Sequence, residues 1–175
     1  MIDQGTGVRG LAGALIACLA CFIGCSGDDG GTAGGDPAAT ALARHDCYVG
    51  LQLPGVTHTG FACSGTGTSS SVSAFHPNTL EVAIRVSMDL AEEPALGELT
   101  LTSLVVEVPD GDVPQRWDAP VQACTAVASD TAVDEQFGWT YFSIEFSCSE
   151  PALPQDGNPG DPLDLGAFSI VTFFG

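Results

Sequence analysis

From Cys47 onward, apolar and polar residues alternate with period two, and turn residues interrupt the alternation at intervals. This pattern is typical of antiparallel strands with one face in the core, because successive side chains point to opposite faces of a sheet. We expect strands at 47–53, 57–63, 79–88, 98–108, 119–128, 139–148 and 164–174. About seven short strands separated by loops rich in Gly, Pro and Asp predict an all-β fold, an antiparallel β-sandwich of either Ig-like or jelly-roll connectivity.

Two segments show the alternation most plainly. Within residues 80–88 the even-numbered side chains from Leu80 to Met88 are apolar, and residues 142–148 repeat the pattern from Phe142 to Cys148. We expect these even-numbered side chains to face the core. In 99–108 the apolar parity switches near Ser103, which predicts a bulge or a strand that moves between sheets.

The remaining pattern completes the expected fold. Residues 168–174 are apolar on both faces towards their end, so we expect that strand to be central or covered. We expect no amphipathic helix, we place the serines Ser69 to Ser71 in a loop, and we find no internal repeat.

The N-terminal segment has the organisation of an export signal. Residues 1–10 contain one cation, Arg9, and residues 11–24 are uncharged and largely apolar. Because about 20 apolar residues are needed to cross a bilayer, this apolar run is too short to be a comfortable anchor helix. We therefore expect a cleaved signal peptide at 1–24.

The end of that signal, Phe22-Ile23-Gly24-Cys25, resembles the bacterial lipobox. The resemblance implies cleavage before Cys25, lipidation of Cys25 and attachment to a membrane through it. Two alternatives stand beside it: a competing match that ends at Cys18 but would truncate the apolar run, and an ordinary secretory signal. Ser26, in place of Asp, resembles the sorting signal for the outer membrane.

A tether and one domain follow the lipidation site. Residues 26–37 are rich in Gly and Asp and contain no large apolar side chain, which is typical of a flexible linker. We expect a lipidated Cys and tether at 25–43 and a single β-sandwich domain at 44–175, because the length suffices for one core.

Charge narrows the possible partners. The 175 residues include no lysine, four arginines and 22 acidic residues, for a net charge of −18, and loss of Arg9 and Asp3 with the signal leaves that value unchanged. A surface this acidic repels phosphate backbones and anionic headgroups. We therefore expect no nucleic-acid partner, and interpret the acidity mainly as a source of solubility; the alternative is attraction of cations or basic partners.

Four cysteines remain after removal of the signal and lipidation, which allows three pairings of two disulfides. A hairpin centred on Gly55 would place Cys47 opposite Cys63, and a hairpin turning within 130–140 would bring Cys124 near Cys148. We predict these two pairs, each worth about 3 kcal/mol in the chain-entropy model. A tetrahedral zinc site would require closely spaced cysteine pairs, which the mature domain lacks.

The sequence offers little catalytic chemistry. It contains neither GxSxG nor HExxH, and its histidines are isolated in loop-like segments, so we expect no enzyme and no cofactor. Acidic loops are weak candidates for calcium, although neither completes an EF-hand pattern and solvated turns are the alternative. The candidate ligands are Asp110, Asp112, Asp156, Asp161 and Asp164.

Aromatic residues are the best candidates for binding. Trp117, Trp139 and Tyr141, with Phe137, could form a stacking platform for sugars, and the alternative is packing in the core or at its rim. Taken as a type, the lipobox, tether and cysteine-paired β-domain resemble uncharacterised envelope lipoproteins of Gram-negative bacteria. We expect a non-enzymatic binding module for a polysaccharide or protein; the alternatives are an assembly lipoprotein in an envelope complex and, third, a hydrolase.

Overall fold

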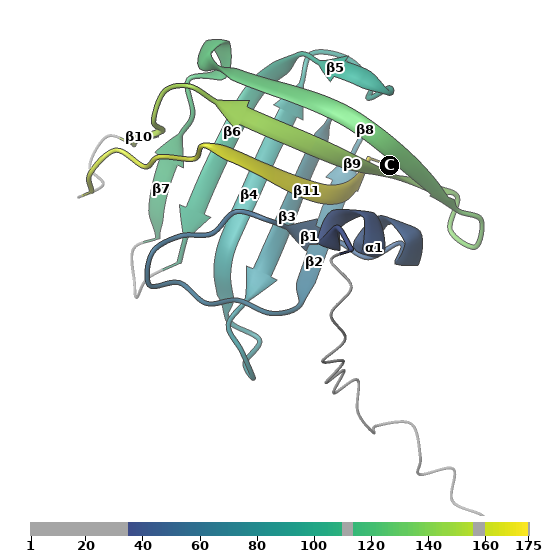
Figure 1. Cartoon of the computed structure of the whole chain (residues 1–175), viewed down its shortest axis with the longest axis horizontal. Coiled ribbons are helices and arrows are strands. Elements are labelled where there is room, and N and C mark those ends of the chain that lie inside the picture. Colours follow the sequence, from purple (N-terminus) through teal and green to yellow (C-terminus); the bar gives the residue numbers. More distant parts are fainter. Residues whose placement is uncertain (1–34, 110–113, 156–159, 175) are drawn as a thin grey trace, which may run out of the picture. The chain divides into compact units, whose positions relative to one another are not determined.

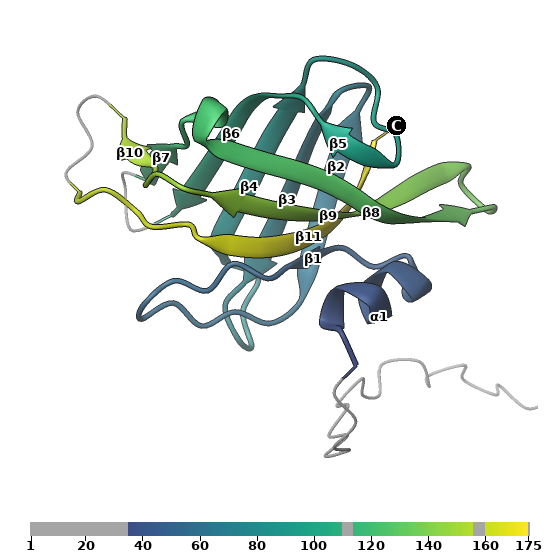
Figure 2. The same cartoon turned by 45° about the horizontal axis from the view of Figure 1, so that its top comes forward.

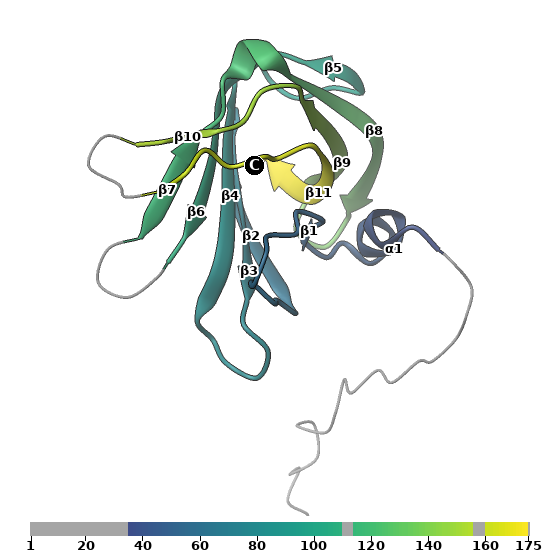
Figure 3. The same cartoon turned by 60° about the vertical axis from the view of Figure 1, so that its left-hand side comes forward.

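The computed structural model describes residues 35–109, 114–155 and 160–174, all within a compact unit, Gly34–Gly175. Within these residues two antiparallel sheets pack face to face, which confirms the predicted β-sandwich (Figures 1 and 3). The predicted signal peptide, Cys25 and most of the predicted tether lie outside the described residues. Among the described residues, no helix has both the length and the hydropathy to cross a membrane.

The five-stranded sheet contains, in spatial order, β1 (Tyr48–Val49), β11 (Ala167–Phe174), β9 (Trp139–Cys148), β8 (Cys124–Asp134) and β5 (Gly97–Leu99). The six-stranded sheet contains β10 (Leu153–Pro154), β7 (Gln115–Asp118), β6 (Leu101–Val108), β4 (Val82–Leu90), β3 (Ser69–Phe75) and β2 (Phe61–Thr66). A 3-10 turn, η1 (Val121–Ala123), precedes β8. The described residues thus form more strands than the seven expected, because β3, β7 and β10 lie where no strand was expected and the expected strand 98–108 is divided into β5 and β6.

The predicted move between sheets is confirmed. β5 pairs with β8 in the five-stranded sheet, and β6 pairs with β4 in the six-stranded sheet. The chain changes sheet at Thr100, and the pairing of β4 with β6 shifts register between Asp89 and Leu90. Leu99 is therefore buried on one sheet, while Leu104 is buried on the other.

The core lies between the sheets and follows the expected parity. Ile84, Val86 and Met88 of β4 are almost fully buried, as are Ile144 and Phe146 of β9. Leu80 was predicted to face the core, and this prediction is wrong, because Leu80 is 93% exposed. A turn precedes β4, in which the backbone N–H of His76 donates to the Glu81 carbonyl, so the strand begins only at Val82.

The serine-rich segment is a strand, which corrects the predicted loop. In β3, Val72 and Ala74 are buried on the core side, and Ser71 and Ser73 lie on the opposite face. The alternation was inconspicuous because serine occupies both kinds of position: Ser70 is also buried. β3 fills the gap between β2 and β4, so it completes the six-stranded sheet.

The expected first hairpin does not form. Only Tyr48 and Val49 of the range 47–53 are a strand, and they pair with β11, whereas β2 begins at Phe61 and pairs with β3. The intervening loop contributes Leu51 and Leu53 to the core without strand pairing. The apolar residues on either side of Pro54 and Gly55 resembled two strands in the sequence, but they are apolar because the loop itself packs into the core.

A helix replaces the last part of the predicted tether. α1 (Pro37–Arg44) begins after Asp36, whose side chain accepts a 3.0 Å hydrogen bond from the Ala38 N–H, and proline at the first helical position supports this start. Ala38 and Leu42, four residues apart, pack with Tyr141 and Val171 on the outer face of the five-stranded sheet. Figure 2 shows α1 beside β1 and β11. β11 is thereby covered, as its sequence predicted.

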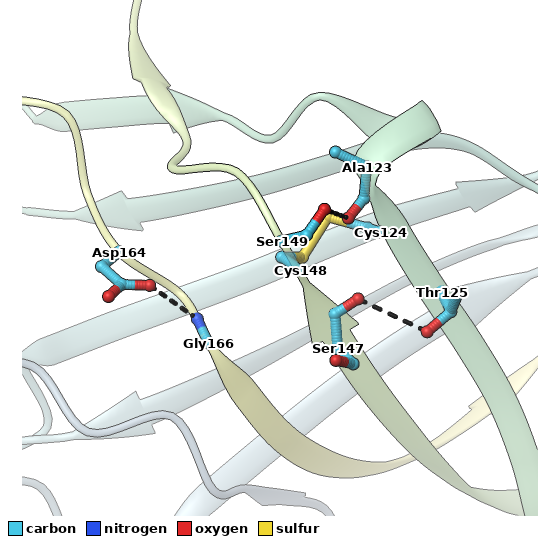
Figure 4. The surroundings of a disulfide bond; sticks show 8 residues. All are labelled: Ala123, Cys124, Thr125, Ser147, Cys148, Ser149, Asp164 and Gly166. Carbon is cyan, nitrogen blue, oxygen red and sulfur yellow. Dashed lines mark hydrogen bonds between the residues drawn. A yellow bond between two sulfur atoms is a disulfide. The ribbon is translucent and has the colours of Figure 1, made fainter.

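Both predicted disulfides form. Cys124 and Cys148 are direct cross-strand partners in β8 and β9, as the hairpin predicted (Figure 4). Cys47 and Cys63 are bonded, but they join the segment before β1 to β2 and thus connect the two sheets. The first pairing was therefore right for a wrong reason. Two disulfides indicate an oxidising compartment outside the cytoplasm.

Candidate binding surface

Five rings form a continuous row on the outer face of the five-stranded sheet, which we call the aromatic row. It comprises Phe137, Trp139, Phe173, Tyr141 and His45. Trp139 stacks on Phe173 with ring centroids 4.6 Å apart and on Phe137 at 4.9 Å. Tyr141 contacts Phe173 at 5.5 Å and His45 at 5.7 Å. Such contacts add about 0.5–1.5 kcal/mol per aromatic pair beyond the area that they bury.

Strand register places the central rings. Trp139 and Tyr141 share the outward parity of β9, and Phe173 of β11 lies directly opposite Tyr141. The parity has a simple cause, since Phe142 and Phe174 at the neighbouring positions point into the core. The aromatic row is therefore built on two adjacent, hydrogen-bonded strands, which makes it a rigid surface.

A tight turn presents Phe137 at the end of the β8–β9 hairpin. The Asp134 side chain accepts hydrogen bonds from the backbone N–H of Gln136 at 2.9 Å and of Phe137 at 3.4 Å. The Gly138 N–H donates to the Asp134 carbonyl at 2.7 Å, and Gly138 has φ of 72°, which favours glycine. In Figure 1 this turn projects beyond the rest of its sheet.

Exposure increases along the row towards the turn. Tyr141 is 5% exposed, Trp139 is 37% exposed and Phe137 is 57% exposed. Tyr141 is therefore part of the packing beneath α1, whereas Phe137 and Trp139 offer aromatic area to a partner. We call these two residues the aromatic tip.

Carboxylates surround this aromatic surface. Burial raises the pKa of Tyr141, and the negative charges of Asp134 and Asp46 raise it further. Burial also raises the pKa of Tyr48, with Asp36 adding to the effect. Both effects favour the neutral phenol, and the second places the negative charges of Asp134, Asp46 and Asp36 near these two rings.

The strand β8 has an open edge next to the aromatic tip. β5 pairs only with Ala126 to Ala128, and β8 continues to Asp134. Among the described residues, no strand pairs with 129–134 on the side away from β9. Val133 on this segment is 56% exposed. An unpaired strand edge can accept a further extended chain.

The predicted stacking residues do not form one platform. Trp117 is 8% exposed in β7 of the other sheet, and its indole N–H donates a 3.0 Å hydrogen bond to the Asp161 carbonyl. Trp139 and Tyr141 do lie together, joined by Phe173, which sequence reasoning did not select. The sequence did contain a signal for Phe173: it is two residues from Val171 on β11, and residues two apart in a strand lie on the same face. His45 was interpreted as an isolated surface residue, because α1 was not expected.

The calcium candidates are only partly described. Asp110, Asp112 and Asp156 lie outside the described residues. Asp164 accepts a hydrogen bond from the Gly166 N–H at 3.1 Å, as in a solvated turn (Figure 4). Across 35–109, 114–155 and 160–174, no group of three or more His, Cys, Asp or Glu side chains is placed to hold a metal ion.

Two hollows lie away from the aromatic row. One, of about 560 Å³, is lined by residues of β7, β10 and the segment after β7, where the Gln155 amide donates to Asp118 at 3.0 Å. Another, of about 570 Å³, includes His76, Arg85 and Glu107, and the two charged side chains form a 2.9 Å ion pair. In each hollow, two of the polar side chains therefore bond to each other.

Compared with known proteins, the chain matches no protein-family model, no curated protein and no solved structure. Its function must therefore be inferred from its own surfaces, of which the aromatic row is the most distinctive.

Proposed function

We propose that this protein is a non-enzymatic envelope lipoprotein that displays a β-sandwich binding module, with the aromatic tip as its contact surface. The observation that supports the proposal best is the exposure of Phe137 and Trp139 on a projecting hairpin. Large aromatic side chains are enriched in binding interfaces, because they bury much area at a small cost in conformational entropy. The partner is a polysaccharide or a protein.

The proposed anchor is lipid on Cys25, with the outer membrane as destination. Ten residues, 26–35, separate Cys25 from the N-cap of α1, and even a fully extended chain of that length reaches only about 35 Å. Lipid chains contribute about 0.8 kcal/mol per buried methylene, and two chains suffice for stable anchoring. The anchor would therefore hold the binding module close to the membrane surface.

Fractionation of cells tests the anchor. The Cys25→Ala variant should move from the membrane fraction to the soluble fraction, while a Cys18→Ala variant should stay with the membrane, because the competing lipobox match ends at Cys18. Recovery of Cys25→Ala in the membrane pellet would contradict lipidation at this site.

Retention by cell-envelope material tests the contact surface. Phe137→Ser should weaken retention of the purified, oxidised chain on isolated envelopes and on cell-wall polysaccharides. Leu80→Ser is a matched control, because Leu80 is 93% exposed and lies in the turn before β4 in the other sheet. Equal retention of the two variants and the wild type would refute a role for the aromatic tip.

A second candidate is an assembly lipoprotein that docks in a larger envelope complex. The open edge of β8 at 129–134 favours it, since an added strand would give a stable, stoichiometric contact. Co-purification of a partner in fixed ratio, lost when Val133 is replaced by proline, would favour this candidate. Retention of isolated polysaccharide without a protein partner would favour the first.

A further inference from the structure

We propose that the aromatic tip and the adjoining open edge of β8 bind an extended, lysine- or arginine-bearing segment of a protein partner. This inference rests on the proposed binding function and names the class of its partner. Three independent features of the surface support it: its charge, its exposed rings and its unpaired strand edge.

Charge selects a basic partner. The chain has a net charge of −18 and no lysine. Of the arginines in the described residues, Arg85 lies 2.9 Å from Glu107 and Arg116 lies 4.0 Å from Asp118, so acidic neighbours offset their charge. Such a surface attracts cationic segments and speeds their encounter, and it repels anionic polysaccharide and anionic lipid.

The residues around the aromatic tip are also mainly acidic. Asp130, Asp134 and Glu135 lie on β8 and the turn that leads to Phe137. At the other end of the row, Arg44 in the last turn of α1 and Asp46 flank His45, so their charges offset each other. The turn that bears Phe137 has Asp134 and Glu135 and no arginine, so the exposed end of the aromatic row is the more acidic end.

Exposed rings beside carboxylates favour a cation. The negative face of an aromatic ring attracts an ammonium or guanidinium group. Trp139 stacks on both Phe173 and Phe137, so the ring that offers an exposed face at the tip is Phe137, which is 57% exposed. A lysine or arginine side chain can place its apolar stem on Phe137 and its charge near Glu135, whose side chain is exposed.

The strand edge favours an extended segment over a folded surface. Residues 129–134 of β8 lack a paired strand on the side of β5, so an added strand can bond to the backbone there. A second copy of this chain is a poor occupant, because two molecules that each have a net charge of −18 repel one another. Asp130 and Asp134 on that edge add local repulsion between copies.

Fluorescence anisotropy of labelled peptides tests the inference with the purified chain in its oxidised form. The probes are a 12-residue peptide of alternating lysine and threonine and its counterpart with glutamate for lysine. Phe137→Ala should weaken binding of the lysine peptide by about tenfold, given the strength of a desolvated cation–π contact. Trp139→Ala should also weaken it, because Phe137 then loses the ring on which it stacks. Glu135→Gln should weaken it about threefold, as expected for an exposed ion pair.

Matched variants separate local from general effects. Glu150→Gln removes the same charge at the opposite end of β9 and should leave binding unchanged. Thermal unfolding of Phe137→Ala should show a folded domain with only a small loss of stability, because this exposed ring lies in a turn outside the two sheets and its stack on Trp139 is its one ring contact among the described residues.

The outcomes distinguish this inference from the function on which it rests. Selective binding of the lysine peptide, with losses confined to the tip variants and Glu135→Gln, supports the inference. Equal binding of both peptides, or equal losses for Glu135→Gln and Glu150→Gln, overturns it. If the lysine peptide fails to bind while a neutral oligosaccharide is retained and lost in Phe137→Ala, the inference falls and the proposed function stands.

Discussion

A methyl group added at Gly65 tests how closely the two sheets approach each other. Gly65 lies in β2, and a Cβ atom built there would lie 2.0 Å from the carbonyl oxygen of Phe173 in β11 and 2.9 Å from its carbonyl carbon. Both obstacles are backbone atoms, so no change of side-chain rotamer can relieve the contact. Gly65→Ala therefore forces β2 away from β11.

The distance by which β2 and β11 must separate determines how much stability Gly65→Ala should lose. Real Cβ contacts essentially never fall below 3.0 Å, so the strands must separate by 3.0 minus 2.0, or 1.0 Å, at the least. Overpacking of this kind costs about 1–3 kcal/mol. The shift also threatens the 2.5 Å hydrogen bond between the buried hydroxyls of Ser70, which is paired with Gly65, and Thr172, worth about 1 kcal/mol. We expect a total loss of about 3 kcal/mol.

Thermal and urea unfolding of the oxidised chain measure this loss. A destabilisation of this size should lower the melting temperature by about 10 °C in a domain of roughly 140 residues. Gly160→Ala is the control, because its Cβ would meet Trp117 at 3.6 Å, an ordinary contact. If Gly65→Ala and Gly160→Ala melt within about 2 °C of each other, the close approach of the sheets at Gly65 is refuted.

Three further predictions concern the parts that hold the domain together. Replacing Cys47 and Cys63 with serine opens a link across 16 residues and should lower the free energy of unfolding by about 3 kcal/mol in urea, and a loss below about 1 kcal/mol would contradict the chain-entropy reasoning. Asp36→Ala removes the N-cap of α1 and should cost about 1 kcal/mol by thermal unfolding, so an unchanged melting temperature would count against the cap. Burial and nearby carboxylates raise the pKa of Tyr48 and Tyr141 above 10.0, so the contribution of these two residues to stability should be constant below that pH and be lost as the pH rises through the raised folded pKa values. Because these are the chain's two tyrosines, tyrosinate absorbance reports on them alone, and ionisation of the folded protein at or below the ordinary pKa would disagree with this result.

Local pattern was sufficient to predict the fold class and the disulfide between Cys124 and Cys148. Period-two alternation in β4 and β9 identifies which side chains face the core, because the geometry of a strand alone determines it. The same parity predicted the change of sheet between Leu99 and Leu104. The pairing of Cys124 with Cys148 also follows from sequence, since both lie on one hairpin. These properties depend on residues close together in the chain.

Spatial neighbours that are distant in the chain could not be predicted in this way. Alternation shows which face a side chain occupies, but it does not show which strands are adjacent, since strand order depends on how the whole chain packs. Trp139 and Phe173 stack only because β9 and β11 are paired. Trp117 is excluded from the aromatic row because β7 belongs to the other sheet. The sequence alone thus determined the buried faces of strands with clear alternation, such as β4 and β9, whereas the tertiary structure decided which aromatic residues share a surface.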